Sequence, residues 1–106
     1  MVVGVAQFEL VMPYNHSLKE KRHILGKLKE RVMSQLHIAV NEVHLQDKWQ
    51  RAVLGFAVVG NDGKKIESLM EKVLRFIQEM ELGQLTAEKS EILFYDDEFE
   101  WDGSES

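Results

Sequence analysis

The 106-residue chain has no cysteine, one proline and no long apolar segment. The absence of thiols excludes disulfide frameworks, thiolate nucleophiles and cysteine-ligated zinc sites. A membrane-spanning helix needs a run of about 18 apolar residues, and no run in the sequence approaches that length. The N-terminal segment MVVGVAQFEL also lacks the basic region that opens a signal peptide. We therefore expect a cytoplasmic protein without membrane segments.

The charge of the chain is unevenly distributed. The formal net charge is -5, from 13 basic and 18 acidic residues. Six of the acidic residues lie in the last segment, DDEFEWDGSES, which leaves 12 acidic against 13 basic residues over 1–95. We predict one near-neutral domain over 1–95 and an acidic, flexible tail over 96–106, in which Phe99 and Trp101 alternate with carboxylates. The tail is either a frayed end or a segment that folds over a basic surface.

The hydrophobic pattern predicts the order β-α-β-β-α-β. Alternation with a period of two indicates strands, and apolar stripes with helical spacing indicate two amphipathic helices. Ser17 and Glu20 fit a capping box that opens the first helix, and Gly83 fits the residue that follows the second. The predicted strands cover 2–12, 37–46 (with a bulge or an early end near Val43), 49–59 and about 86–95, and the predicted helices cover 18–36 and the apolar stripe from Ile66 to Met80. This order is typical of an α+β, ferredoxin-like βαββαβ two-layer sandwich, a four-stranded antiparallel sheet with two helices on one face.

No set of residues with a catalytic or metal-binding arrangement is evident in the sequence. His37 and His44 lie on opposite faces of a predicted strand, which is wrong for shared metal ligation. No G-x-S-x-G motif is present. Glu9 and Glu91 are able to meet on the sheet, either as an acid–base pair or as ordinary exposed glutamates. We therefore predict a protein that is not an enzyme, with no catalytic residue, metal or cofactor.

The first predicted helix carries a basic surface. At about 100° per residue, Lys19, Arg22 and Lys29 line one flank of the apolar stripe, and Lys21 lies near its other edge. Over residues 17–36, two acidic residues oppose six basic ones. Such a flank is suited to phosphate contacts with RNA. The alternative is an ordinary solvated helix face.

The predicted hairpin between the second and third strands is a second candidate for nucleic-acid binding. Trp49 is positioned to stack on a base, while Gln50 and Arg51 are positioned to donate hydrogen bonds to phosphates or base edges. The alternative is that Trp49 packs back on the hairpin or forms a subunit contact.

The sheet face without helices offers neither aromatic residues nor positive charge on its central strands, so RNA binding across it is not expected. It does offer aliphatic side chains together with small residues that allow close approach. We predict these residues as candidates for an interface with a partner or a second copy of the chain: Val3, Val5, Val11, Val53, Gly55, Ala57, Val59, Leu93 and Tyr95.

Three segments taken together resemble the YlxP-like family of small bacterial proteins, long described as a domain of unknown function. They are SLKEKR after a strand and a proline-containing loop, QDxWQRA, and VVxND. The resemblance covers about residues 1–95 and implies a ferredoxin-like fold in a bacterial cytosolic protein. In some genomes the family is encoded among translation-initiation and ribosome-maturation factors. The resemblance implies no established activity, cofactor or catalytic residue.

Two hypotheses follow. The first is a non-enzymatic module that binds structured RNA or a ribosomal or maturation particle through the basic helix and the hairpin tip. The second is a homo-oligomeric interaction domain, with a homodimer the simplest case, or a small-ligand regulatory domain that uses the open sheet face. No feature of the sequence points to DNA or to a membrane.

Overall fold

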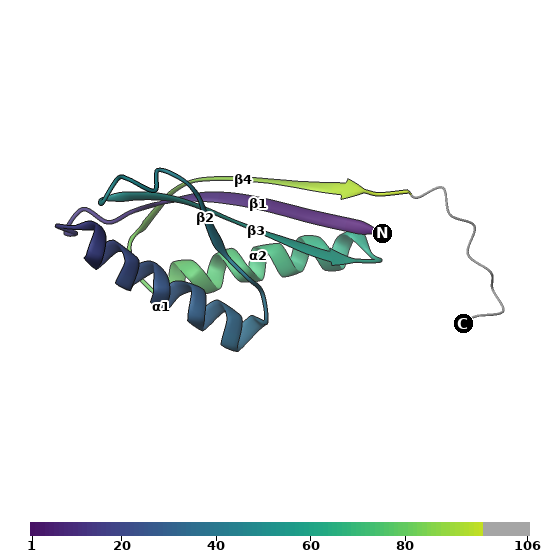
Figure 1. Cartoon of the computed structure of the whole chain (residues 1–106). Helices are drawn as coiled ribbons and strands as arrows, with labels where there is room; N and C mark the ends of the chain where they lie inside the picture. The colour runs from purple at the N-terminus through teal and green to yellow at the C-terminus, as the bar shows by residue number, and fades with distance from the viewer. Residues whose placement is uncertain (97–106) are drawn as a thin grey trace.

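In the computed structural model, which describes residues 1–96, two helices cover one face of a four-stranded antiparallel sheet (Figure 1). The elements are β1 (Val2–Val11), α1 (Leu18–Leu36), β2 (Asn41–His44), β3 (Arg51–Gly60), α2 (Gly63–Glu79) and β4 (Gln84–Phe94). The strand order is β2-β3-β1-β4. The predicted ferredoxin-like fold is confirmed. Residues 97–106 of the predicted acidic tail, with Phe99 and Trp101, lie outside the described residues.

The core lies between the sheet and the two helices. Alternate side chains of β1 and β3, including Phe8 and Leu54, point toward the helices, and the apolar stripes of α1 and α2 meet them with residues such as Leu28 and Val73. Burying one side chain of this size stabilises the fold by about 1.5–3 kcal/mol. The opposite face of the sheet carries no helix from residues 1–96 (Figure 1).

The start of α1 follows the predicted capping motif with one difference. Ser17 is the N-cap, and its Oγ accepts a hydrogen bond of 3.1 Å from the backbone N–H of Glu20. The carboxylate of Glu20 accepts from the backbone N–H of His16 at 2.9 Å, one residue earlier than a capping box requires. The helix ends at His37, whose left-handed conformation closes the last turn.

The second strand is shorter than predicted. β2 has four residues, and its pairing with β3 shifts register between Glu42 and His44. The sequence left open a bulge or an early strand end at this point, and both occur, since the register shifts and the strand ends at His44. Leu45 then adopts a left-handed backbone conformation, with a φ of 64°, which turns the chain into the β2–β3 loop.

The turn after α2 differs from the prediction that Gly83 provides a left-handed residue. The left-handed residue is Glu81, with a φ of 54°, and no glycine among residues 1–96 has a positive φ. Gly83 is instead needed for close packing. A Cβ atom at this position would lie 2.8 Å from the carbonyl oxygen of Val11 and 3.0 Å from Cγ of Leu10.

We expect Gly83→Ala to lower the free energy of unfolding by about 1–3 kcal/mol, because the added methyl group displaces backbone at the end of β1. Gly26→Ala is the matched control, since a Cβ at Gly26 on α1 meets no atom within 4 Å apart from the backbone of its own helix. This control should raise stability by about 0.5–1 kcal/mol through helix propensity. Urea denaturation measures both changes, and equal effects at the two glycines would contradict the packing argument.

Candidate functional site

The N-terminal turns of α1 and the β2–β3 loop meet at one end of the molecule, and we call this region the helix–hairpin corner (residues 17–29 and 45–50). The two segments are joined by Lys21, whose side chain is only 2% exposed. Its Nζ donates hydrogen bonds to the carbonyl oxygens of Leu45 at 2.7 Å and Lys48 at 2.5 Å. The same nitrogen lies 2.6 Å from Oε2 of Glu42, an ion pair in which the carboxylate is 17% exposed. The prediction that Lys21 contacts phosphate is wrong, because its charge is used inside the protein.

Asn15 and Gln50 make a second connection at the corner. The Asn15 side chain, which is 3% exposed, donates through Nδ2 to the carbonyl oxygens of Trp49 and Ser17. Gln50 donates through Nε2 to the carbonyl oxygens of Pro13 at 3.3 Å and Asn15 at 3.2 Å. The Gln50 amide, predicted as a tip contact for RNA, thus holds the β1–α1 loop.

The remaining predicted residues of the corner face solvent to different extents. Lys19 and Arg22 are exposed, whereas Lys29 is half-buried. Trp49 is 45% exposed, on a loop with hydrogen bonds at Leu45, Lys48 and Gln50. The structure therefore brings Lys19, Arg22 and Trp49 to the same end of the molecule.

Arg51 lies apart from this group, on the open face of the sheet. Its guanidinium contacts Oε2 of Glu9 through Nη2 at 2.5 Å and Nε at 3.1 Å. Thr86 donates to the other carboxylate oxygen at 2.6 Å. The hydrogen bond from Thr86, followed by that from Arg51, lowers the pKa of Glu9. Arg51 and the basic flank of α1 are on opposite sides of the sheet, so the predicted combination of Arg51 with these residues is not formed.

The open face of the sheet holds eight of the nine predicted interface residues in rows across the strands, whereas Tyr95 follows the end of β4 and is 58% exposed. Val3 lies opposite Val59 on one side and Leu93 on the other, and Val5 lies opposite Ala57. Val59 is 63% exposed. The row of Val3, Val59 and Leu93 is apolar, whereas the next row joins Val5 and Ala57 to the charged Glu91. The rows at the other end contain the Glu9 ion pair together with the predicted interface residues Val11, Val53 and Gly55.

Glu9 and Glu91 do not meet as an acid–base pair. The register places Glu91 opposite Val5 and Ala87 opposite Glu9. Within residues 1–96, no cluster of three or more histidine, aspartate or glutamate side chains is arranged to hold a metal ion. No helix in the same part of the chain is long and apolar enough to cross a membrane.

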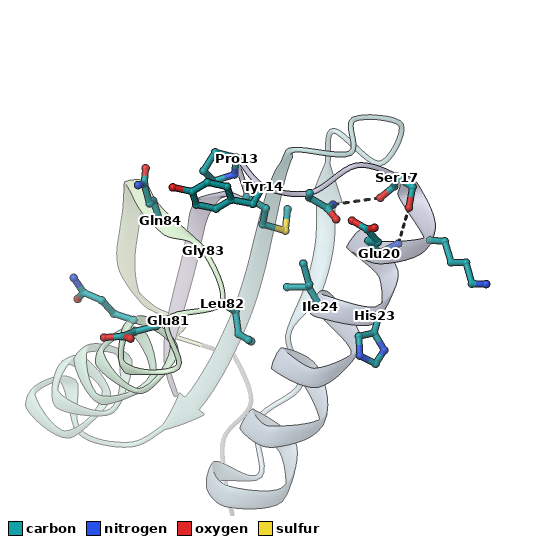
Figure 2. Close-up of a pocket in the computed structure, with 14 residues that line it drawn as sticks. Pro13, Tyr14, Ser17, Glu20, His23, Ile24, Glu81, Leu82, Gly83 and Gln84 are labelled. Atoms are coloured by element: carbon teal, nitrogen blue, oxygen red, sulfur yellow. Dashed lines mark hydrogen bonds between the residues drawn. The ribbon is translucent and has the colours of Figure 1, made fainter.

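A groove between α1 and α2 was not predicted from the sequence. It has a volume of about 850 Å³, and Ile24 from α1 and Leu82 from the α2–β4 connection point toward each other across it, with Tyr14 at its rim (Figure 2). Asn15 also lines it, and its Oδ1 is buried without a hydrogen-bond partner among the described residues. The groove depends on how the two helices pack, so no local pattern in the sequence indicates it.

We expect Lys21→Met to lower the free energy of unfolding by about 3 kcal/mol, because it leaves the partly buried carboxylate of Glu42 without its cation. It also removes the donor for two loop carbonyls. Lys19→Met, at an exposed position of the same helix, should change stability by less than about 0.5 kcal/mol. Lys21→Met/Glu42→Leu should recover part of the loss, since both charges are then absent. Equal urea midpoints for the two single variants would show that the buried interactions of Lys21 do not stabilise the fold.

The lowered pKa of Glu9 predicts a pH dependence of stability. The carboxyl of Glu9 binds its proton less tightly in the folded protein than in the unfolded chain. Its contribution to the free energy of unfolding is therefore fully present above the ordinary pKa of glutamate, and this contribution is lost as the pH falls through the lowered pKa. Thr86→Val should raise the pKa of Glu9 toward its ordinary value, whereas Thr86→Ser keeps the hydroxyl and should leave it low. NMR titration of the Glu9 carboxyl carbon measures this, and identical titrations in the two variants would show that the Thr86 hydroxyl has no effect.

Comparison with known proteins shows the family of the chain. Residues 3–89 match the family model of a protein of unknown function (DUF503). The uncharacterized protein YlxP of Bacillus subtilis (strain 168) is 34% identical over 76 residues, which are 72% of this chain and 83% of that protein. This finding confirms the predicted YlxP-like resemblance.

Two solved structures are similar to this chain. The structural-genomics protein YJCS has a TM-score of 0.52 and 16% identity, over 84% of this chain and 96% of that one. A dimeric ferredoxin-like protein from an uncultured marine organism has a TM-score of 0.41 and 13% identity, over 96% and 95%. The first likeness shows the fold alone. By its sequence, the chain belongs to the DUF503 family of proteins of unknown function.

Proposed function

We propose that the protein is a non-enzymatic module that binds structured RNA, free or in a ribosomal particle, through the helix–hairpin corner. The observation that supports this most is the burial of Lys21. Its bonds to the carbonyls of Leu45 and Lys48 fix the β2–β3 loop against the start of α1. The basic flank of α1 and the exposed indole of Trp49 are thereby held as one preorganised surface, which lowers the entropic cost of binding.

The electrostatics of α1 favour an anionic partner even without Lys21. Lys19, Arg22, Lys27 and Arg31 are exposed, and Lys29 is half-buried. Of the two acidic residues on the helix, Glu20 accepts the backbone N–H of His16. Basic side chains on one helix release counterions when they contact phosphates, which is the main source of sequence-independent affinity for RNA.

Trp49 supplies the second element of the surface. Unpaired bases of an RNA loop stack on aromatic side chains, and such stacking is worth about 1–3 kcal/mol per base. A stacking platform is most effective when its backbone is fixed, and the Trp49 carbonyl is held by Asn15. The open sheet face has Gln7, Gly55 and Ala57 at its centre and is not suited to this role.

A second candidate function is association through the open sheet face, as a protein-interaction or small-ligand domain. The observation in its favour is the apolar end of that face. There Val59 on β3 lies opposite Val3 on β1 and is 63% exposed. The ion pair of Glu9 with Arg51 limits this apolar surface to one end.

The RNA proposal is tested by fluorescence anisotropy with a labelled stem–loop RNA over a series of salt concentrations. Lys19→Glu/Arg22→Glu should weaken binding at low salt and reduce the slope of log K against log salt by about 1.4, at about 0.7 per lost contact. Trp49→Ala should weaken binding about tenfold with little change in the slope.

The matched control is Lys64→Glu/Lys65→Glu, which makes the same change in net charge at the start of α2. This helix begins at the opposite end of the sheet from the corner (Figure 1). The control should retain most of the affinity. Equal losses of affinity in the two double variants would show that only the net charge of the protein matters and would refute a specific surface. The absence of RNA binding by the wild type would also refute the proposal.

A further inference from the structure

One long edge of the sheet has no neighbour. β4 has eleven residues, and all but two of them are exposed. It pairs with β1 on one side only, and nothing within residues 1–96 pairs with its outer edge. β2, at the other edge, has only four residues. A long free edge presents a row of backbone N–H and C=O groups that a further strand is able to pair with.

We propose that a second copy of the chain pairs with this edge, β4 against β4 and antiparallel, to form a continuous eight-stranded sheet from two four-stranded ones. The two-fold axis passes between the two copies of Ser90. This surface is the edge of the sheet, distinct from both the open face and the helix–hairpin corner.

The charges along β4 select this register. When two identical antiparallel strands pair about a two-fold axis, one residue lies opposite its own copy, and its neighbours on either side lie opposite each other. An axis at Glu88, Lys89 or Glu91 places like charges directly opposite one another, which is destabilising. Centres nearer either end of β4 pair fewer residues. An axis at Ser90 avoids direct like-charge pairs near the middle of the strand.

With the axis at Ser90, the opposite pairs are complementary on the open face. Lys89 faces the partner's Glu91, and the two-fold axis generates this pair twice. Ala87 faces the partner's Leu93, which extends the contact with an apolar pair. On the helix-covered face, Glu88 faces the partner's Ile92, which is the least favourable pair of this register.

Lys89 and Glu91 have no competing partner in the described part of the chain. Their neighbours on β1 are Gln7 and Val5, which carry no charge. Neither side chain takes part in an ion pair within residues 1–96. Both are exposed, so the two charges are available to a second copy.

The pairing is also compatible with the rest of the molecule. A two-fold axis perpendicular to the sheet leaves the helices of both copies on the same side. In the order β2-β3-β1-β4, the β2–β3 hairpin is at the far edge from β4. The dimer would therefore present two helix–hairpin corners, one at each outer edge.

The test is sedimentation velocity on the full chain at low ionic strength, over a range of concentrations. We expect a dimer for the wild type. Lys89→Glu and Glu91→Lys should each weaken dimerisation about tenfold or more, because each converts two attractive cross-strand pairs into repulsive ones. The double variant Lys89→Glu/Glu91→Lys exchanges the charges and should restore the dimer. Thermal unfolding by circular dichroism confirms that each variant is folded.

Val59→Lys is the matched control, since it places a charge on the open face and leaves the edge of β4 unchanged. It should retain the dimer. A monomeric wild type, single variants that dimerise normally, or a double variant without recovery would each overturn the proposal. Loss of the dimer in Val59→Lys alone would instead assign the contact to the open face.

Discussion

The position of the β2–β3 hairpin depends on one buried cation. Transfer of an ammonium group from water into a protein interior costs several kcal/mol, and only close counter-charges and hydrogen bonds offset that cost. Lys21 has both, from the carboxylate of Glu42 and from the carbonyl oxygens of Leu45 and Lys48. Because these partners belong to β2 and its loop, the requirement to satisfy Lys21 fixes the hairpin against α1.

Some basic residues of the chain are used in contacts within the protein, and others remain free to contact a partner. Lys21 is neutralised in the interior, and Arg51 is paired with Glu9 on the far face of the sheet. Lys19 and Arg22 remain in solvent beside a loop whose backbone is held at several points. The proposed RNA surface and the proposed dimer edge lie at opposite sides of one sheet, so occupation of one leaves the other accessible.

The sequence was informative about the helices and strands, and less so about individual charged residues. Helical spacing of about 100° per residue places Lys21 within the stripe formed by Leu25 and Leu28, and this was the available signal that its side chain is buried. Its interpretation as a surface cation was wrong because the partners that make burial tolerable lie 21 to 27 residues away. Strand alternation placed the predicted interface residues on the open face, but the pairing of Arg51 with Glu9 needed the register of β1 against β3.

The pattern of apolar residues, the Ser17 cap and the irregularity in the second strand were determined by the sequence alone, because each depends on residues close together in the chain. Tertiary structure decided the burial of Lys21, the separation of Arg51 from the basic helix, the groove between the helices and the free edge of β4. Each of these depends on groups that are distant in sequence and become neighbours only when the sheet and helices pack. The physical reason is that the solvation and pairing of a charge are set by the surrounding fold, whereas the period of a helix or strand is set by the local backbone.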